Sequence, residues 1–137
     1  MTEEKKEFNL PSILESVDKA ASEAESFARE SGFDDAALFA IDMAVREAVA
    51  NAVKHGNKQD STKFVEITFS NLNKGLEVTI RDFGEGFEVE EVPDPTNPEN
   101  LLKANGRGVL FMKTFMEEVE WLRHQKGGMI VKMCKLR

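Results

Sequence analysis

Apolar residues recur along the chain at two spacings, one typical of helices and one typical of strands. Residues 13–28 and 38–52 repeat apolar side chains at helical spacing, and 109–116 is a shorter apolar helical segment. Residues 65–69 and 76–80 instead alternate apolar and polar positions with period two. These patterns predict a pair of amphipathic helices, two strands and a third, short helix.

Turn signals and further alternating segments complete the expected sheet. Asn73-Lys74-Gly75 is a hairpin signal between the first two strands. Two closing strands, 119–123 and 129–136, are separated by a turn at Lys126-Gly127-Gly128, and Phe8-Asn9-Leu10 suits a short edge strand. Helices segregated from such strands predict an α+β two-layer sandwich, in which a mixed, mostly antiparallel sheet is covered by helices on one face.

Helix boundaries can also be read from the sequence. Ser12 and Glu15 form the Ser-x-x-Glu pattern of a capping box, and Gly32 lies where a helix end favours glycine. Asp34 is a good N-cap for the second helix, which we expect to end near His55-Gly56. We expect His55 to have a structural role at that helix end, where a cation is favoured.

Composition narrows the classes of protein that fit. The 137 residues are 41% hydrophobic and 31% charged, which suits one domain spanning 1–137. The net charge is −7, from 25 acids and 18 bases, without a large basic cluster, which argues against direct nucleic-acid binding. The sequence has no stretch suited to a membrane span and no export signal. The single cysteine, Cys134, is expected to be buried and inert, and a cytoplasmic location is predicted.

Residues 88–105 differ from the rest of the chain. They contain three of the four prolines, several acids and few large apolar residues. A loop longer than about 15 residues usually indicates a functional lid or disorder. We expect a lid over about 88–107.

Three short motifs carry candidate chemistry. Glu47 and Asn51 are four residues apart on the second helix and lie beside its apolar stripe. They are either polar boundary residues or a catalytic pair, in which the amide oxygen of Asn51 binds a hard cation such as Mg²⁺ and Glu47 accepts a proton.

The second motif, Asp82-Phe83-Gly84-Glu85-Gly86-Phe87, follows a strand. It is either an ordinary tight turn or a place where Gly84 and Gly86 let a flat ligand approach the backbone. Asp82 could then accept a hydrogen bond from an exocyclic amine such as that of adenine. The triplet Asp82-Phe83-Gly84 also occurs in eukaryotic-type protein kinases, but the chain lacks their other motifs and is too short for that fold.

The third motif, Gly106-Arg107-Gly108, opens the short apolar helix. Free backbone N–H groups and the helix dipole favour phosphate at such a helix start. The motif is weak evidence by itself, because it matches neither a Walker A sequence nor a dinucleotide-binding fingerprint.

In this order, the three motifs resemble the N, G1 and G2 boxes of the GHKL ATPases, over nearly the whole chain. The small size, the Pro-Ser entry to the first helix, Glu-Ala-Val-Ala-Asn-Ala-Val-Lys-His-Gly and Gly-Arg-Gly-Val are similar to the bacterial anti-sigma-factor serine/threonine kinases. The resemblance implies the histidine-kinase-like ATPase fold, with ATP and Mg²⁺ as ligands.

The resemblance also implies a role for each motif residue. Asn51 would hold Mg²⁺, and Glu47 would be the general base toward a partner's serine. Asp82 would bind the adenine amine, with the nearby residues Gly84, Gly86 and Phe87 lining the base. Gly106 and Gly108 would approach the phosphates, where Arg107 could add a positive charge or instead face a partner.

The implied partners are an anti-anti-sigma STAS-domain protein, which would donate the serine, and a sigma factor. Family members are commonly homodimers, so a homodimer is expected. The family usually has a Gly-Thr pair where this chain has Gly127-Gly128-Met129. Without that hydroxyl, a nucleotide-gated switch protein without useful kinase activity stays open as the alternative. A plain ATPase has less support, because no coupling domain is evident.

Overall fold

The computed structural model describes residues 4–57, 60–84 and 108–137, with only the backbone of 108–111. The expected lid at 88–107, and with it Gly86, Phe87, Gly106 and Arg107, lies outside the described residues. The described elements, in chain order, are β1 (Glu4–Pro11), α1 (Glu15–Glu30), α2 (Asp35–Asn51), η1 (Ala52–Gly56), β2 (Phe64–Asn71), β3 (Gly75–Arg81), α4 (Gly108–Phe115), β4 (Glu118–Arg123) and β5 (Met129–Leu136).

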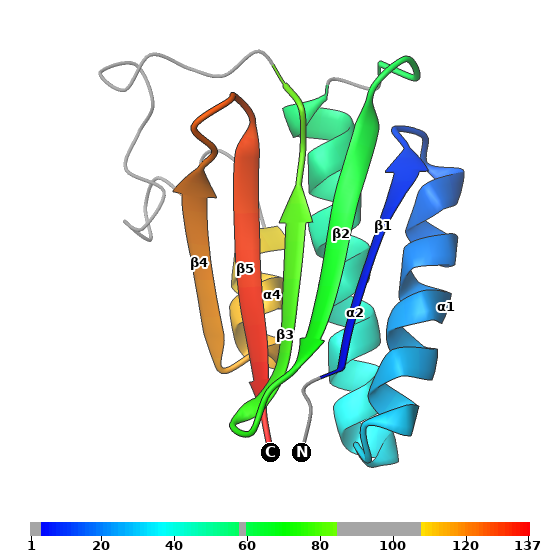
Figure 1. The fold of residues 1–137 in the computed structure, drawn as a ribbon, viewed down its shortest axis with the longest axis vertical. Helices are drawn as coiled ribbons and strands as arrows, with labels where there is room; N and C mark the ends of the chain where they lie inside the picture. The colour runs from blue at the N-terminus through cyan, green and yellow to red at the C-terminus, as the bar shows by residue number, and fades with distance from the viewer. Residues whose placement is uncertain (1–3, 58–59, 85–107) are drawn as a thin grey trace.

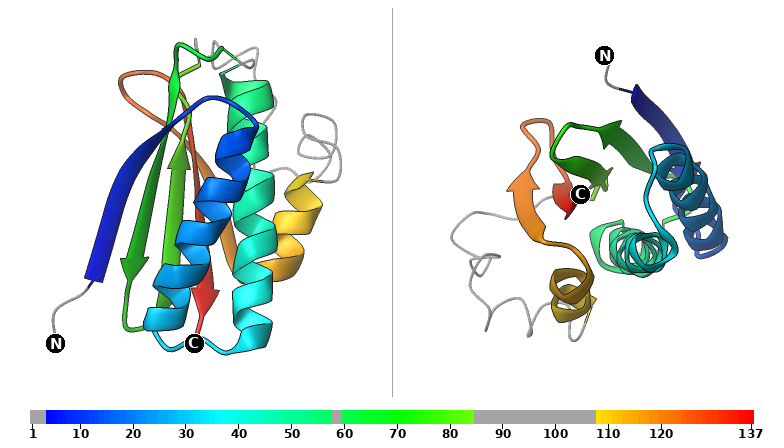
Figure 2. Two further views of the ribbon diagram at one scale, coloured as in Figure 1. Left: turned by 90° about the vertical axis from the view of Figure 1, so that its right-hand side faces the viewer. Right: turned by 90° about the horizontal axis from the view of Figure 1, so that it is seen from below.

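The five strands form one sheet in the order β1-β2-β3-β5-β4, and all four described pairings are antiparallel (Figure 1). The helices lie together on one face of this sheet, with α2 between α1 and α4 (Figure 2). The predicted α+β two-layer sandwich is confirmed, and its described sheet is antiparallel throughout. The hairpin at Asn73-Lys74-Gly75 and the closing strand pair are confirmed as well.

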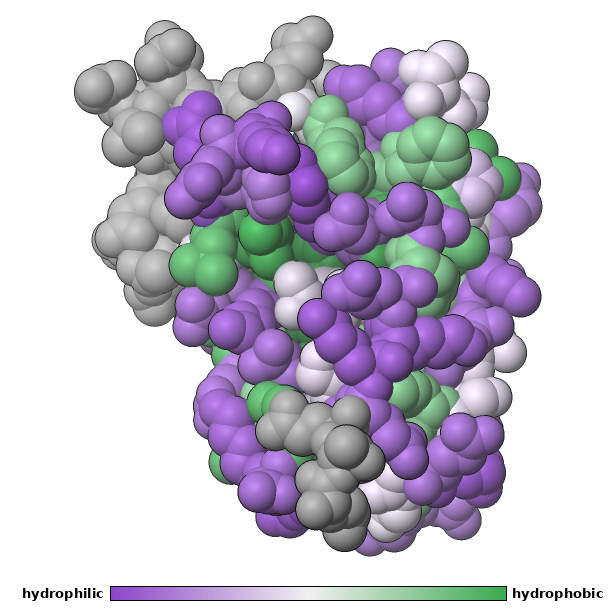
Figure 3. Space-filling model, viewed as in Figure 1, coloured by the Kyte–Doolittle hydropathy of each residue, from purple (hydrophilic) through white to green (hydrophobic). Residues whose placement is uncertain are grey.

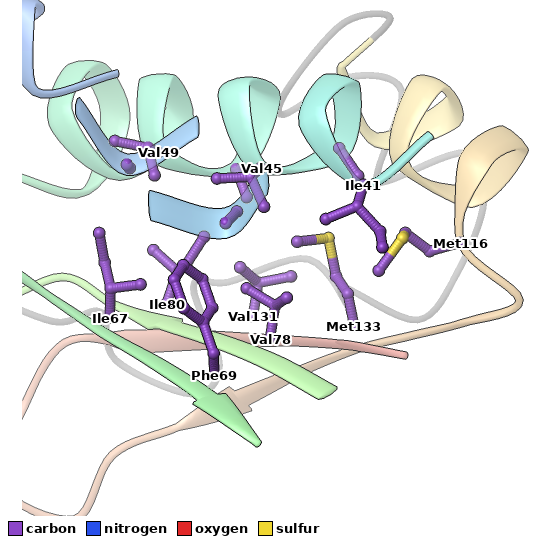
Figure 4. Close-up of a cluster of buried hydrophobic side chains, with 14 of the residues drawn as sticks. Ile41, Val45, Val49, Ile67, Phe69, Val78, Ile80, Met116, Val131 and Met133 are labelled. Carbon is purple, nitrogen blue, oxygen red and sulfur yellow. The ribbon is translucent and has the colours of Figure 1, made fainter. Parts of the chain in front are cut away.

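Period-two alternation sorts the strand residues between the two faces of the sheet. Phe69, Val78 and Met133 are neighbours in the register, are fully buried and point toward the helices. They meet Ile41 and Val45 of α2 in the core (Figure 4). The opposite face is mainly hydrophilic (Figure 3). One row across that face reads Glu7, Thr68, Thr79, Lys132 and Glu120.

The predicted capping box at the start of the first helix is wrong. Helix α1 begins at Glu15, and no side chain caps it. Ser12 is instead buried, where its backbone N–H donates to the Lys63 carbonyl at 3.0 Å and its hydroxyl accepts from Asn57 at 3.0 Å. Tertiary hydrogen bonds outside the helix therefore take the place of the local cap.

The connection between α1 and α2 follows the predicted turn chemistry. Gly32 has φ +90°, its N–H donates to the Arg29 carbonyl, and the Phe33 N–H donates to the Ala28 carbonyl. This is the Schellman pattern that glycine favours. Asp34 then caps α2 by accepting a hydrogen bond from the Ala37 N–H at 2.9 Å. Both predicted boundaries are confirmed.

Helix α2 ends earlier than the sequence pattern predicts. Its α-helical part stops at Asn51, and Ala52–Gly56 continue as the π-helical turn η1. Among the described residues, no helix is long and apolar enough to cross a membrane. Cys134 is buried, as predicted.

Candidate functional site

Three segments that are far apart in the sequence meet at one end of the sheet, at the top of Figure 1. They are the end of α2 with η1, the Asp82-Phe83-Gly84 segment after β3, and the turn between β4 and β5. The Phe83 N–H donates to Asn57 Oδ1 at 2.8 Å, which joins the first segment to the second. The Asp82 N–H donates to the Met129 carbonyl at 3.0 Å, which joins the second to the third.

Asp82 is the buried acid of this end, with 7% of its surface exposed. Its Oδ1 accepts from the backbone N–H groups of Gly84 and Met129, each at 3.1 Å. Burial raises the pKa of the Asp82 carboxyl, and these two hydrogen bonds lower it by less. Among the described residues, no hydrogen bond is made to the other carboxyl oxygen, Oδ2. The carboxyl is therefore fixed in place by one oxygen and has a second acceptor left.

Three glycines let the backbone close around Asp82. A Cβ on Gly56 would clash with Asp82 Oδ2, and one on Gly84 would clash with the Gly56 carbonyl oxygen. Gly128 has φ +82°, and a Cβ there would clash with the Asp82 carbonyl oxygen. Glycine is thus required here by close packing of the protein on itself.

Glu47 and Asn51 lie one turn apart near the end of α2, and both are half-buried. The Asn51 Nδ2 is fully buried and lacks a hydrogen-bond partner within the described part of the chain. An unpaired buried amide costs roughly 1–3 kcal/mol and calls for an explanation. Asn51 is also the last residue before η1, and π-helical turns occur frequently at functional sites.

The neighbouring Arg46 turns away from this pair. It forms ion pairs with Asp42 at 3.0 Å and with Asp18 of α1 at 2.5 Å. Both carboxylates raise the pKa of Arg46. Arg46 therefore joins α1 to α2 and does not neutralise Glu47.

The structure brings Asp82 and Gly84 together with the end of the helix that carries Glu47 and Asn51. Gly108 begins α4, which packs beside α2. Gly86, Phe87, Gly106 and Arg107 fall outside the described residues, so their predicted roles stay predictions. His55 is exposed at the end of η1.

The described groups fit a nucleotide with its cation. The buried Nδ2 of Asn51 is a donor without a partner among the described residues and could donate to a phosphate oxygen, which leaves the amide oxygen for a cation. Asp82 Oδ2 is a further acceptor at the same end of the sheet. Among the described residues, no group of three or more His, Cys, Asp or Glu side chains could hold a metal ion alone. Mg²⁺ is commonly bound through one or two side chains and the phosphates of the substrate.

Sequence reasoning did not predict the contacts that three residues make at this end, namely Gly56, Asn57 and Gly128. Asn57 is 1% exposed and bonds to three other segments, and the two glycines enclose Asp82. The His55-Gly56 dipeptide gave only a helix end. Gly128 is expected in the turn before the last strand, where the family has its Gly-Thr pair, but its contact with Asp82 joins positions far apart in the chain and is not predicted.

The position that departs from the family pattern also contacts Asp82. Met129 follows Gly128 at the start of β5, and its N–H donates to Asp82 Oδ1. The backbone thus supports the carboxyl at this position. A methionine side chain offers no hydroxyl there.

Comparisons with known proteins show the family to which the chain belongs. A family model described as a histidine kinase-like ATPase domain matches residues 10–135. The anti-sigma F factor of Heyndrickxia coagulans is 35% identical over 66% of this chain, and the match spans 64% of that protein, less than two thirds of its length. The serine-protein kinase RsbW of Oceanobacillus iheyensis is 28% identical over 91% of this chain and 82% of its own length.

Another relative and one solved structure extend the comparison. The anti-sigma F factor of Anoxybacillus flavithermus is 37% identical, over 72% of this chain and 68% of that protein. The crystal structure of the RsbU and RsbW domains of Rv1364c from Mycobacterium tuberculosis superposes with a TM-score of 0.69 at 17% identity. It covers 97% of this chain and 32% of that chain, and it shows the shared fold.

Proposed function

The chain belongs to the histidine kinase-like ATPase family, and from that premise we propose that it is an ATP-dependent protein serine kinase that also acts as an anti-sigma factor. The relatives named anti-sigma F factor and serine-protein kinase support both parts. The observation that carries the proposal is the buried Nδ2 of Asn51, a donor without a partner among the described residues, on a side chain one helical turn from the carboxylate of Glu47.

Asp82 would recognise the adenine. Its carboxyl is held by two hydrogen bonds to Oδ1, which leaves Oδ2 as an acceptor for the exocyclic amine. Gly86 and Phe87 would line the base. Gly106, Gly108 and Arg107 would lie near the phosphates, where backbone N–H groups and a positive charge are favourable.

Asn51 would hold Mg²⁺ through its amide oxygen, and the cation would offset negative charge on the phosphates. Glu47 would act as the general base. Its carboxylate would take the proton from a serine hydroxyl as the serine oxygen bonds to the γ-phosphorus of ATP. The bond from that phosphorus to the β–γ bridging oxygen breaks, and ADP leaves. A positioned base of this kind typically contributes about 10²–10⁴ in rate.

The proposed phosphoryl acceptor is an anti-anti-sigma protein of the STAS type, and the proposed regulated partner is a sigma factor. The names of the relatives and the negative charge of −7, unsuited to DNA, favour protein partners. A homodimer located in the cytoplasm belongs to the same proposal.

A phosphotransfer assay tests the proposal directly. The protein is incubated with γ-labelled ATP, Mg²⁺ and a STAS-domain protein, and serine phosphorylation is measured beside ATP binding. We expect labelled serine with the wild type. Glu47→Gln should bind ATP but lower the transfer rate at least about 100-fold, the usual scale for losing a positioned base. Asn51→Ala should lose affinity for Mg-ATP.

The alternative is a nucleotide-gated switch without useful transfer, which the methionine in place of the family's threonine favours. ATP binding without serine phosphorylation would support the switch and contradict the kinase. Unchanged Mg-ATP affinity in Asn51→Ala would contradict the assignment of Asn51. A folded wild-type protein that binds no ATP would contradict both functions.

A further inference from the structure

Asn57 uses its side chain to join three separate segments. Its Nδ2 donates to Ser12 Oγ at 3.0 Å and to the Phe64 carbonyl at 2.9 Å. Its Oδ1 accepts from the Phe83 N–H at 2.8 Å. Asn57 is 1% exposed, so these bonds form away from water. They connect the β1–α1 junction, the start of β2 and the segment after β3.

The bond to Phe83 differs from the other two, because it holds the segment that carries Asp82. Phe83 directly follows Asp82 and precedes Gly84, so it belongs to the segment that leaves the sheet. The bond from the Asp82 N–H to the Met129 carbonyl is the last described backbone hydrogen bond between the end of β3 and β5. The Asn57 oxygen is the described acceptor for the next N–H along the chain. It therefore fixes the first residue after Asp82.

Asn57 also directly follows η1, so it relates this segment to the end of the helix that carries Asn51. Gly56, the residue before Asn57, places its carbonyl oxygen against Gly84, so the end of η1 and the segment after β3 are in contact there as well. Buried and fully bonded amide networks of this kind make local structure rigid. Asn57 thus sets the distance between the Asp82 segment and the end of α2.

We propose that Asn57 is a positioning residue for adenine recognition, holding the Asp82-Phe83-Gly84 segment in register with the end of α2. This inference rests on the proposed function, since it concerns the base that Asp82 would read. A merely structural Asn57 would affect the stability of the fold alone. A positioning Asn57 also affects the preference for adenine over a base that lacks the exocyclic amine.

The test compares binding of Mg-ATP and Mg-ITP, because the inosine base lacks that amine. Asn57→Ala should weaken ATP binding about five- to tenfold, the effect of losing about one hydrogen bond, and should reduce the preference for ATP over ITP by a similar factor. Asn57→Asp keeps an acceptor oxygen for the Phe83 N–H and should retain the preference.

Ser12→Ala is the matched control. It removes a bond of the same network but leaves the one to Phe83 intact. It should lower the midpoint of chemical unfolding while keeping both affinities within about twofold, well under one hydrogen bond in free energy.

The outcomes separate the inference from the proposed function. A folded wild type that binds no ATP contradicts the proposed function. Wild-type binding, together with an unchanged ATP-to-ITP ratio in folded Asn57→Ala, overturns the positioning role. An equal loss of preference in Ser12→Ala overturns it as well. Should Asn57→Ala fail to fold, Asn57→Asp decides: retained preference supports the inference and lost preference refutes it.

Discussion

The ionised form of the Asp82 carboxyl is unfavourable in the folded protein. The fold buries this carboxyl and, among the described residues, supplies hydrogen bonds to one of its two oxygens. Burial raises the pKa of its carboxyl above the ordinary value. The folded state therefore binds this proton more tightly than the unfolded chain does. The contribution of Asp82 to stability is present below the unfolded pKa, about 3.9, and is lost as pH rises through the raised folded pKa.

Replacing Asp82 by asparagine should accordingly stabilise the protein near neutral pH. The amide keeps an acceptor for the Gly84 and Met129 N–H groups and carries no charge. We expect a gain in the free energy of unfolding of about 0.5–2 kcal/mol at pH 7, the usual size for a stabilising substitution. The gain should shrink as the pH approaches 4, which urea unfolding across pH would measure.

Asp60→Asn is the matched control for this prediction. Asp60 lies before β2, and its hydrogen bonds with the hydroxyl and the backbone N–H of Thr62 lower the pKa of its carboxyl. Asp60→Asn should not raise the free energy of unfolding at any pH. A pH-independent gain in Asp82→Asn would contradict the role of the buried charge.

At the scale of residues, the sequence was informative where a motif is local. Glu47, Asn51 and Asp82 were singled out from patterns only a few residues long. Asn57 was not, because its three partners, Ser12, Phe64 and Phe83, are distant in the chain and become neighbours only after folding. The contact between Gly128 and Asp82 was not predicted for the same reason, since the two residues become neighbours only after folding.

At the scale of elements, periodicity predicted the type of every described helix and strand named in the sequence analysis, but it predicted boundaries less well. The start of α1 shifted because Ser12 bonds to Asn57 and Lys63 instead of capping the helix. The π-helical turn η1 was not foreseen, since its residues suit an ordinary helix. Edge strand β1 is longer than Phe8-Asn9-Leu10, because pairing with β2 extends it back to Glu4.

The contribution of the N-cap residue Asp34 to the stability of α2 can be tested by mutation. Asp34→Ala removes the acceptor for the Ala37 N–H, so we expect a loss of about 1 kcal/mol in the free energy of unfolding. Asp35→Ala is the control in the next position, where the side chain is 98% exposed and its described ion pair, with Arg29, is as long as 4.0 Å. Thermal unfolding should show a clearly larger effect for Asp34. Equal effects would show that the cap bond contributes nothing beyond general charge.

At the scale of the whole molecule, the alternation of buried and exposed strand positions determines which face of the sheet receives the helices. That much followed from the sequence. The strand order β1-β2-β3-β5-β4 did not, because it places β5 between β3 and β4 through long-range pairing.

Cys134 offers a measure of the whole fold. It lies on the inner strand β5, is 3% exposed, and burial raises the pKa of its thiol. We expect it to react with a thiol reagent only through global unfolding, at a rate that rises with denaturant. If the protein binds Mg-ATP, a concentration 100 times the dissociation constant should slow labelling about 100-fold.

The unfolded protein in strong denaturant is the control, and it should react at the rate of a free cysteine. Rapid labelling of the native protein would show that β5 opens locally. An ATP effect much smaller than expected, in a protein shown to bind ATP, would lead to the same conclusion.

The glycines packed around Asp82 have a consequence for how this sequence can change over generations. Gly56, Gly84 and Gly128 each face a backbone or carboxyl atom that any larger residue would strike. The three positions are far apart in the sequence. A substitution at one of them cannot be compensated by a smaller side chain at another, because glycine has no side chain. Selection should therefore act on all three as on one unit.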